Sequence, residues 1–174
     1  SLSSPTIADH LGSKAGTWLE AIETGEASAQ SISDVRRRFQ LRRGYADPKL
    51  LGKNRGWLTA NGVQVVDCPP PAGMRFGASA ANLMLDALDV VDGDPEEIIL
   101  LAADYDLSPI LLRLRARNQR VVIYATPSTP ASYRAHADGA IEESLLFAIL
   151  SRPTDSTADI VKGSIGGLGM RSHA

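Results

Sequence analysis

Two aspartates, Asp104 and Asp106, are the residues of this 174-residue chain that are best placed to do chemistry. They follow an apolar run over residues 98–103, which is typical of a strand buried on both faces of a parallel sheet. In open parallel sheets, ligands bind beyond the carboxyl ends of the strands. Carboxylates two residues apart around a turn can face one point, and Mg²⁺ takes one or two carboxylates together with waters and phosphate oxygens. The pair therefore suggests a metal site; the alternative is that Asp106 caps the next helix while Asp104 is solvated.

The elements that must position this pair form a strand–helix–strand unit. Ser108 and Pro109 open a helix, because proline suits the first helical turn. Asn118 ends that helix, and a β-branched strand follows over residues 120–124. Such crossovers are right-handed and pair parallel strands, so the unit predicts a parallel sheet.

The remaining sequence predicts more elements of the same kind. Helical patterns are found near residues 14–23, 48–60, 80–91 and 131–137, a last apolar element at 141–150, and short strands near residues 5–9, 36–45 and 63–66. We expect an α/β domain over residues 1–150 and a flexible tail rich in Pro, Ser, Thr and Gly over residues 151–174. Trp18 and Trp57 fall on apolar helix faces, where core packing is favoured over base stacking.

Composition excludes several classes of protein. The net charge of -2 and the pI of about 5.9 give no overall basic field, so any contact with RNA has to be local. The single cysteine, Cys68, excludes an internal disulfide and a cysteine-built zinc site. No apolar run is long enough to span a bilayer, and the first residues lack the pattern of a signal peptide. We therefore expect a cytoplasmic protein without a membrane partner.

The densest basic cluster of the sequence consists of arginines between residues 36 and 43. Arginines neutralise phosphates and supply much of the affinity of proteins for nucleic acids. The cluster is therefore a candidate RNA-backbone site, and the alternative is a solvated edge strand. Its members are Arg36, Arg37, Arg38, Arg42 and Arg43.

Several motifs, in order and spacing, resemble those of one protein family. Residues 100–110, followed by the strand at 121–124, look like the S-x-D-S-D-F-x-P-L block of NYN domains, which are relatives of PIN nucleases. Four more segments resemble the family's R-x-x-Y-G-D, H-G-I, D-A-M-D and A-D-x-F-I motifs: residues 42–47, 62–63, 86–89 and 137–141. The resemblance covers roughly residues 5 to 145 and includes the LabA-like members.

This resemblance implies a PIN-like (Rossmannoid) doubly wound fold with a mainly parallel central sheet flanked by helices. It also implies endoribonuclease activity that depends on Mg²⁺ or Mn²⁺, in which metal-activated water cleaves an RNA phosphodiester. Asp104 and Asp106 carry over as catalytic and metal-binding residues, and Asp9 matches the acid at the end of the family's first strand. Asn82 and Ser108 are polar residues near the expected site, and we expect them to contact the substrate.

The sequence also departs from the family at the site, which is therefore degenerate. Asp9 lacks the asparagine of the family's D-G-x-N motif, Ala80 stands where many relatives carry a helix acid, and Ala102 replaces a small hydroxyl residue. The alternative function is therefore a catalytically degenerate module that binds RNA or a protein partner, with homodimerisation through a free sheet edge also open. A third reading, an aspartyl-nucleophile phosphatase-like hydrolase, lacks the matching downstream lysine and acid pattern.

Overall fold

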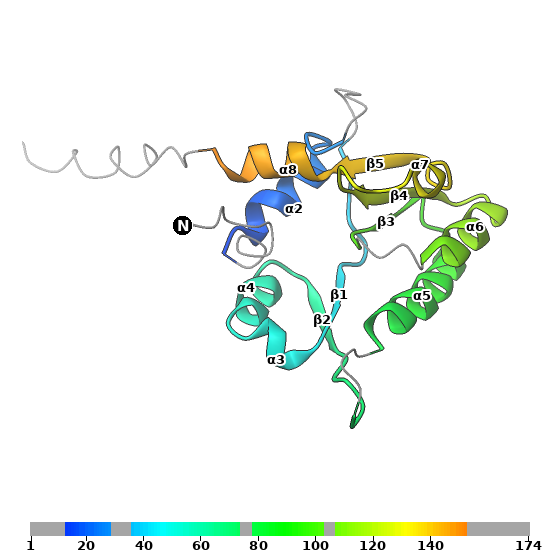
Figure 1. Cartoon of the computed structure of the whole chain (residues 1–174). Helices are drawn as coiled ribbons and strands as arrows, with labels where there is room; N and C mark the ends of the chain where they lie inside the picture. The colour runs from blue at the N-terminus through cyan, green and yellow to red at the C-terminus, as the bar shows by residue number, and fades with distance from the viewer. Residues whose placement is uncertain (1–12, 29–35, 74–77, 103–106, 153–174) are drawn as a thin grey trace, which may run out of the picture.

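The computed structural model describes residues 13–28, 36–73, 78–102 and 107–152, which alternate between helices and short strands (Figure 1). The strands are β1 (Arg43–Ala46), β2 (Gln64–Asp67), β3 (Glu97–Leu100), β4 (Arg120–Ala125) and β5 (Gly139–Glu142). The helices are α2 (Ala15–Glu23), α3 (Pro48–Leu51), α4 (Asn54–Ala60), α5 (Ser79–Val90), α6 (Ser108–Ala116), α7 (Ala131–Arg134) and α8 (Glu143–Leu150), with a 3-10 turn η1 at Val91–Gly93.

The described strands form two parallel sheets instead of one central sheet. β1 pairs with β2, from Arg43 opposite Gln64 to Ala46 opposite Asp67. The second sheet has the order β3-β4-β5, with Ile98 opposite Val121 in its first pair. The predicted α/β fold with parallel strands is confirmed, whereas the predicted strand over residues 5–9 lies outside the described residues.

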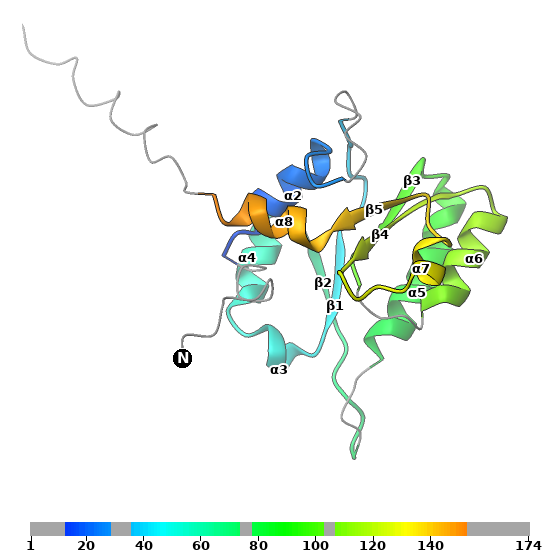
Figure 2. The ribbon, with the colours of Figure 1, turned by 45° about the horizontal axis from the view of Figure 1, so that its top comes forward.

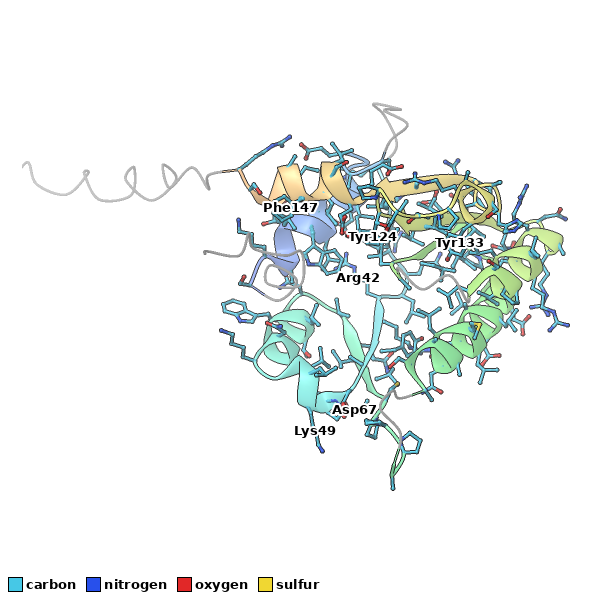
Figure 3. All side chains as sticks on the ribbon, viewed as in Figure 1. Arg42, Lys49, Asp67, Tyr124, Tyr133 and Phe147 are labelled. Carbon is cyan, nitrogen blue, oxygen red and sulfur yellow. The ribbon has the colours of Figure 1, made fainter. Side chains whose placement is uncertain are left out.

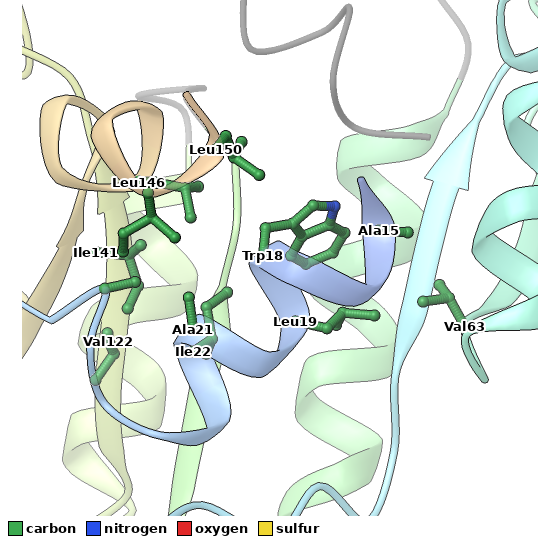
Figure 4. Packing of buried hydrophobic residues seen from close by; sticks show 12 residues of the cluster. Ala15, Trp18, Leu19, Ala21, Ile22, Val63, Val122, Ile141, Leu146 and Leu150 are labelled. Carbon is green, nitrogen blue, oxygen red and sulfur yellow. The ribbon is translucent and has the colours of Figure 1, made fainter. Parts of the chain in front are cut away.

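The three-stranded sheet has helices on both faces, as a doubly wound fold requires (Figures 1 and 2). On one face, Trp18 and Ile22 of α2 belong to the same buried cluster as Ile141 of β5 and Leu150 of α8 (Figure 4). On the other face, Leu111 and Leu114 of α6 pack with side chains of β3, β4 and α5, among them Leu100, Val121, Ile123 and Ala87. β4 is the central strand, and its β-branched side chains Val121, Val122 and Ile123 are all buried.

The first described strand, β1, is shorter than the strand predicted over residues 36–45. Only Arg43–Ala46 pairs as a strand, and residues 36–42 form no strand. The amide of Arg37 donates instead to the carbonyl of Glu23, 2.7 Å away, so this segment is fixed against the end of α2. A backbone N–H donates one hydrogen bond, so the Arg37 amide is not available for pairing with a neighbouring strand.

The α3–α4 segment packs differently from the prediction. Neither of these two helices contains a buried residue, and Leu50 is 82% exposed. The prediction of core packing is confirmed for Trp18, which is buried, and wrong for Trp57, which is 49% exposed. Figures 1 and 2 both show α3 and α4 beside β2 and away from the β3-β4-β5 sheet, so the second core cluster does not reach them. Among the described helices, none is long and apolar enough to cross a membrane.

Candidate functional site at the carboxyl ends of the strands

A cavity of about 1160 Å³ lies between the two sheets. Its walls include β1 and the segment before it, all of β3, and side chains of α2 and α5. At the amino ends of the strands it is lined by Arg37 and Glu97, and toward the carboxyl ends by Tyr45 and Ala102. The cavity therefore runs along most of β1 and all of β3 and reaches the edge where parallel sheets bind their ligands.

The residues on either side of Asp104 and Asp106 lie at this carboxyl edge. Ala102 follows β3, and Leu107 directly precedes α6; both line the cavity and belong to the same apolar cluster. Leu107 is only 1% exposed, so the chain returns into the core immediately after residues 103–106. Asp104 and Asp106 themselves lie outside the described residues, as does Asp9, and their roles stay predictions.

The start of α5 supplies the next wall of the cavity. Ser79 and Ala80 line the cavity in the first turn, and Ala80 packs against the cluster that contains Leu100 and Leu107. Asn82 donates from its side-chain amide to the sulfur of Cys68, 3.1 Å away. Its amide is therefore engaged with the residue that follows β2, on the side of α5 near the β1-β2 sheet.

Arg37 is part of the structure that joins the two sheets. Its Nε lies 2.5 Å from Oε1 of Glu97, the first residue of β3. Its Nη1 donates to the carbonyl of Ile22 at 2.9 Å and to the hydroxyl of Ser28 at 3.1 Å. With the Arg37 side chain only 12% exposed, most of its donors are used inside the molecule.

Arg42 and Arg43 also have partners within the chain. Arg42, which is labelled in Figure 3, pairs with Glu23 and donates to the carbonyl of Asn61 at 3.0 Å. Its guanidinium carbon lies 4.9 Å from the centre of the Phe39 ring. Arg43 donates to Asp86 at 2.8 Å and to the side chain of Gln64 at 2.9 Å. Three arginines of the predicted cluster, Arg37, Arg42 and Arg43, therefore hold contacts within the fold.

Arg36 and Arg38 form the solvent-facing part of that cluster. Both are exposed, and among the residues that the structure describes neither has an ion-pair partner. Both also line the cavity wall near the amino ends of the strands. The charge that remains available for a phosphate backbone is therefore smaller than the sequence suggested, and it lies at the opposite end of the cavity from Ala102.

A tyrosine–carboxylate pair lies on the same cavity wall. Oδ2 of Asp86 accepts from the hydroxyl of Tyr45 at 2.7 Å and from Arg43 at 2.8 Å. Burial, and then the hydrogen bond to Asp86, raise the pKa of Tyr45 to about 12. The hydrogen bond from Tyr45, followed by that from Arg43, lowers the pKa of Asp86. Tyr45 is therefore a neutral donor at pH 7, and this Oδ2 already holds two donors.

The loop after β4 is closed by its own hydroxyl groups. The amide of Thr126 donates to Oγ1 of Thr129 at 2.9 Å, and the hydroxyls of Thr126 and Ser128 lie 2.9 Å apart. Arg134 donates to the carbonyl of Thr126 at 2.9 Å. This loop borders the carboxyl edge, but its hydroxyls hold the turn together.

Two acids at the end of β5 were missed in the sequence. Glu142 accepts twice from Arg134, at 2.6 Å and 3.1 Å. Glu143 accepts from the hydroxyl of Tyr124 at 2.9 Å, and burial, followed by this hydrogen bond, raises the pKa of Tyr124. The available signal was their position where a strand ends, since Glu142 is the last residue of β5 and Glu143 is the first residue of α8. Both carboxylates have partners, which favours a structural role.

The donor chemistry of the predicted acids suits a divalent cation. Carboxylate oxygens are the ligands that Mg²⁺ and Mn²⁺ prefer. In the described ranges, no group of three His, Cys, Asp or Glu side chains can hold a metal ion. Ala80 and Ala102, which both line the cavity, contribute no ligand. The predicted ligands Asp9, Asp104 and Asp106 lie outside the described ranges, so the cation site stays a prediction.

Comparison with known proteins places the chain in a family. The sequence model of the NYN domain matches residues 14–147, which is most of the chain. None of the curated proteins compared with the chain matches it. A crystal structure of a protein of unknown function from Vibrio parahaemolyticus is similar in fold, with a TM-score of 0.50 and 24% identity over 59% of this chain and 68% of that one. The resemblance seen in the sequence is confirmed, and the chain belongs to the NYN domain family, whose members are PIN-like.

Proposed function

We propose that this protein is a divalent-metal-dependent endoribonuclease in which Asp104, Asp106 and Asp9 hold the cation. The observation that carries the proposal is the anchoring of the chain on both sides of residues 103–106. Ala102 after β3 and Leu107 before α6 both line the cavity and pack in one apolar cluster, which supports a site at the carboxyl edge of β3. Membership of the NYN family supports RNA as the substrate class.

The chemistry assigns separate tasks to the chain's residues. A water oxygen bonds to phosphorus, the bond from phosphorus to one ester oxygen breaks, and the proton of the water ends on the leaving oxygen. When bound, a Mg²⁺ or Mn²⁺ ion supplies neutralisation of phosphate charge and a water of lowered pKa. The three aspartates would hold the ion without acting as nucleophiles, and Asn82 of α5 and Ser108 of α6 are the proposed substrate contacts.

The RNA backbone would be held by Arg36 and Arg38. These two arginines are exposed on the cavity wall, whereas Arg37, Arg42 and Arg43 are engaged within the fold. Two exposed arginines suit an acidic protein that contacts RNA locally, because each phosphate contact releases counterions and adds affinity.

A second function is favoured by Ala80. A methyl group stands in the first turn of α5 where relatives carry a carboxylate, and it packs into the apolar cluster. Each lost carboxylate removes charge and a ligand from a cation site. A degenerate domain that binds RNA, a protein partner or a second copy without cleaving is the alternative.

Cleavage of a labelled pool of single-stranded and structured RNA distinguishes these functions. Nuclease activity is expected to require Mn²⁺ or Mg²⁺, to stop with EDTA and to fall about 100-fold in Asp104→Asn. Asp92→Asn is the matched control, because Asp92 is an exposed acid of η1. RNA binding without cleavage, unchanged by EDTA and by Asp104→Asn, would establish the binding module instead.

A further inference from the structure

The segment formed by α3 and α4 exposes large apolar side chains that the core does not use. Neither helix contains a buried residue. Leu50 of α3 is 82% exposed, and Trp57 of α4 is 49% exposed. Trp18, the other tryptophan of the chain, is buried in the cluster around α2. The indole of Trp57 is therefore an aromatic surface that a ligand can cover.

Two lysines of the same segment carry charges that the fold does not compensate. Lys49 and Lys53 are exposed, and in the described part of the chain neither takes part in an ion pair. The nearby acids are engaged elsewhere: Asp47 accepts from the backbone amide of Lys49 at 2.9 Å, and Asp67 of β2 pairs with Arg55. Figure 3 shows the side chain of Lys49 extending away from α3. The segment therefore offers two positive charges to an anion.

Charge and aromatic ring are neighbours at the start of α4. Lys53 precedes this helix with helical dihedral angles, φ −63° and ψ −22°, and stands four residues before Trp57. Helical side chains at that spacing are about 5–6 Å apart at their Cβ atoms. At Gly56, a Cβ would meet no atom within 4 Å apart from its chain neighbours, so the surface beside Trp57 is open. A planar base can therefore approach the indole while its phosphate meets the lysine.

The segment begins at the same edge of the sheets as the candidate site. Tyr45 lines the cavity toward its carboxyl end, β1 ends at Ala46, and α3 starts at Pro48. Figures 1 and 2 both show α3 and α4 beside β2, on the side of the two-stranded sheet away from α5. A chain of nucleotides that leaves the carboxyl edge of β1 in this direction meets Lys49 first and then α4.

We propose that the α3–α4 segment binds single-stranded RNA, with an unpaired base stacked on Trp57 and phosphates held by Lys49 and Lys53. Stacking on an aromatic ring and neutralisation of phosphates are the two interactions that hold single strands without reading their sequence. The exposed residues of α4 other than Trp57 are Gly56, Thr59 and Ala60. This mixed surface lacks the apolar stripe with which a helix binds a protein groove or a membrane.

The choice of RNA as the polyanion rests on the proposed function, which this site extends to substrates with unpaired bases. Stacking and phosphate contacts by lysine need no divalent cation, so binding at Trp57 is measured in EDTA, where metal-dependent cleavage stops. Binding that is retained without any cleavage in Mn²⁺ would count against the metal site alone. Cleavage in Mn²⁺ without contact at Trp57 would count against the α3–α4 site alone.

Tryptophan fluorescence of the full chain tests the stacking contact. The probe is a single-stranded oligouridylate of about ten nucleotides, titrated in EDTA. A base stacked on the indole is expected to quench the emission of Trp57. Trp18→Phe leaves Trp57 as the only tryptophan and is expected to keep the quenching, whereas Trp57→Phe is expected to abolish it.

The affinity for the same RNA, carrying a label, separates stacking from a structural effect. Trp57→Ala is expected to weaken binding about tenfold, because one stacked base is lost. Trp57→Phe is expected to stay within about threefold of the unsubstituted chain, since a phenyl ring also stacks. If Trp57→Ala does not fold, the quenching of the unsubstituted chain still decides the question.

The salt dependence of binding tests the two lysines. Lys49→Ala with Lys53→Ala is expected to reduce the slope of log affinity against log salt by about 1.4, since each phosphate contact with a single strand contributes about 0.7. Arg113→Ala is the matched control, because Arg113 is an exposed cation of α6 that has no ion-pair partner among the described residues. The control is expected to leave the slope unchanged.

Three results would overturn the proposal. The first is Trp57 emission that RNA leaves unchanged, or a salt slope that the double lysine variant leaves unchanged. The second is a blue shift of Trp57 emission with vesicles of phosphatidylcholine and phosphatidylserine but no quenching by RNA, which would show a membrane surface. The third is a blue shift that depends only on protein concentration, which would show a second copy of the chain on α4.

Discussion

Arg37 and Glu97 form an ion pair, 2.5 Å between Nε and Oε1, that ties the segment before β1 to the first residue of β3. Their side chains are 12% and 17% exposed, so the pair is shielded at the amino end of the cavity. Arg120 lies 3.0 Å from the other oxygen of the same carboxylate. The Arg37–Glu97 ion pair thus connects the two sheets at the amino ends of their strands, while the candidate site lies at the carboxyl ends.

Removing Arg37 should destabilise the fold. Arg37→Ala leaves Glu97 with Arg120 as its remaining ion-pair partner among the described residues and deletes hydrogen bonds to Ile22 and Ser28. We expect the free energy of unfolding in urea to drop by about 2 kcal/mol, because a shielded carboxylate loses its closest partner. Arg38→Ala is the control, since Arg38 is exposed, and should cost less than about 0.5 kcal/mol. Equal losses in both variants would contradict a structural role for this pair.

Two leucines of α6, one buried and one exposed, test how this helix packs in the core. Leu114 is 0% exposed and Leu112 is 51% exposed on the same helix. Leu114→Ala should lower the free energy of unfolding by about 2–5 kcal/mol, and Leu112→Ala by less than about 1 kcal/mol. Chemical denaturation of both variants checks this, and a similar small change in both would mean that α6 does not pack on β4 as described.

Acid should weaken the fold partly through Asp86. Its pKa is lowered in the folded protein, first by the hydrogen bond from Tyr45 and then by Arg43. A lowered folded pKa adds stability above the unfolded value of 3.8, and this stability is lost as the pH falls through the folded pKa. In Asp86→Asn the loss of stability below pH of about 4 should be smaller than in the unsubstituted chain. An identical acid limb in both proteins would argue against the triad of Tyr45, Asp86 and Arg43.

Stability at alkaline pH tests the hydrogen bond between Tyr45 and Asp86 from the side of the tyrosine. The pKa of Tyr45 is raised from 10.0 to about 12. A raised folded pKa gives stability that is fully present below pH 10.0 and is lost as the pH rises through about 12. Tyr45→Phe should flatten the decline in this range only in part, because burial also raises the pKa of Tyr124. Ultraviolet titration of the phenolates checks the assignment, and ionisation of Tyr45 near its ordinary value would contradict it.

RNA affinity should depend on the exposed arginines and only weakly on salt. The double variant Arg36→Ala and Arg38→Ala is expected to weaken binding to a labelled RNA and to reduce the slope of log affinity against log salt by about 1–2. Thermal unfolding should stay unchanged, because both side chains are exposed. An unaltered salt slope would remove these arginines from the RNA surface.

The central strand–helix–strand unit was predictable from the sequence because local signals agree there. Pro109 in the first turn of α6 and the β-branched strand β4 are confirmed. The apolar run is confirmed as a strand over Glu97–Leu100 only, because β3 ends there and Leu101 is 42% exposed. The division into two sheets could not be read in this way. It depends on the pairing of strands far apart in sequence, which periodicity does not encode.

The roles of the arginines and of Trp57 depended on tertiary contacts. Arg37 meets Glu97 at a separation of 60 residues, so its sequence neighbourhood could suggest only a basic cluster. Trp57 sits on a helix of seven residues that contains no buried residue. An apolar face predicts burial only if another element covers it, and the folding of α3 and α4 beside β2 leaves this one half exposed.

Calorimetric titration of Mn²⁺ into the full chain tests most directly whether three aspartates share one cation. We expect one saturable site that is lost or weakened at least about tenfold in Asp9→Asn, Asp104→Asn and Asp106→Asn, and kept in Asp92→Asn. Binding that is absent from the unsubstituted chain, or that persists unchanged in Asp104→Asn, would contradict a metal site at the end of β3.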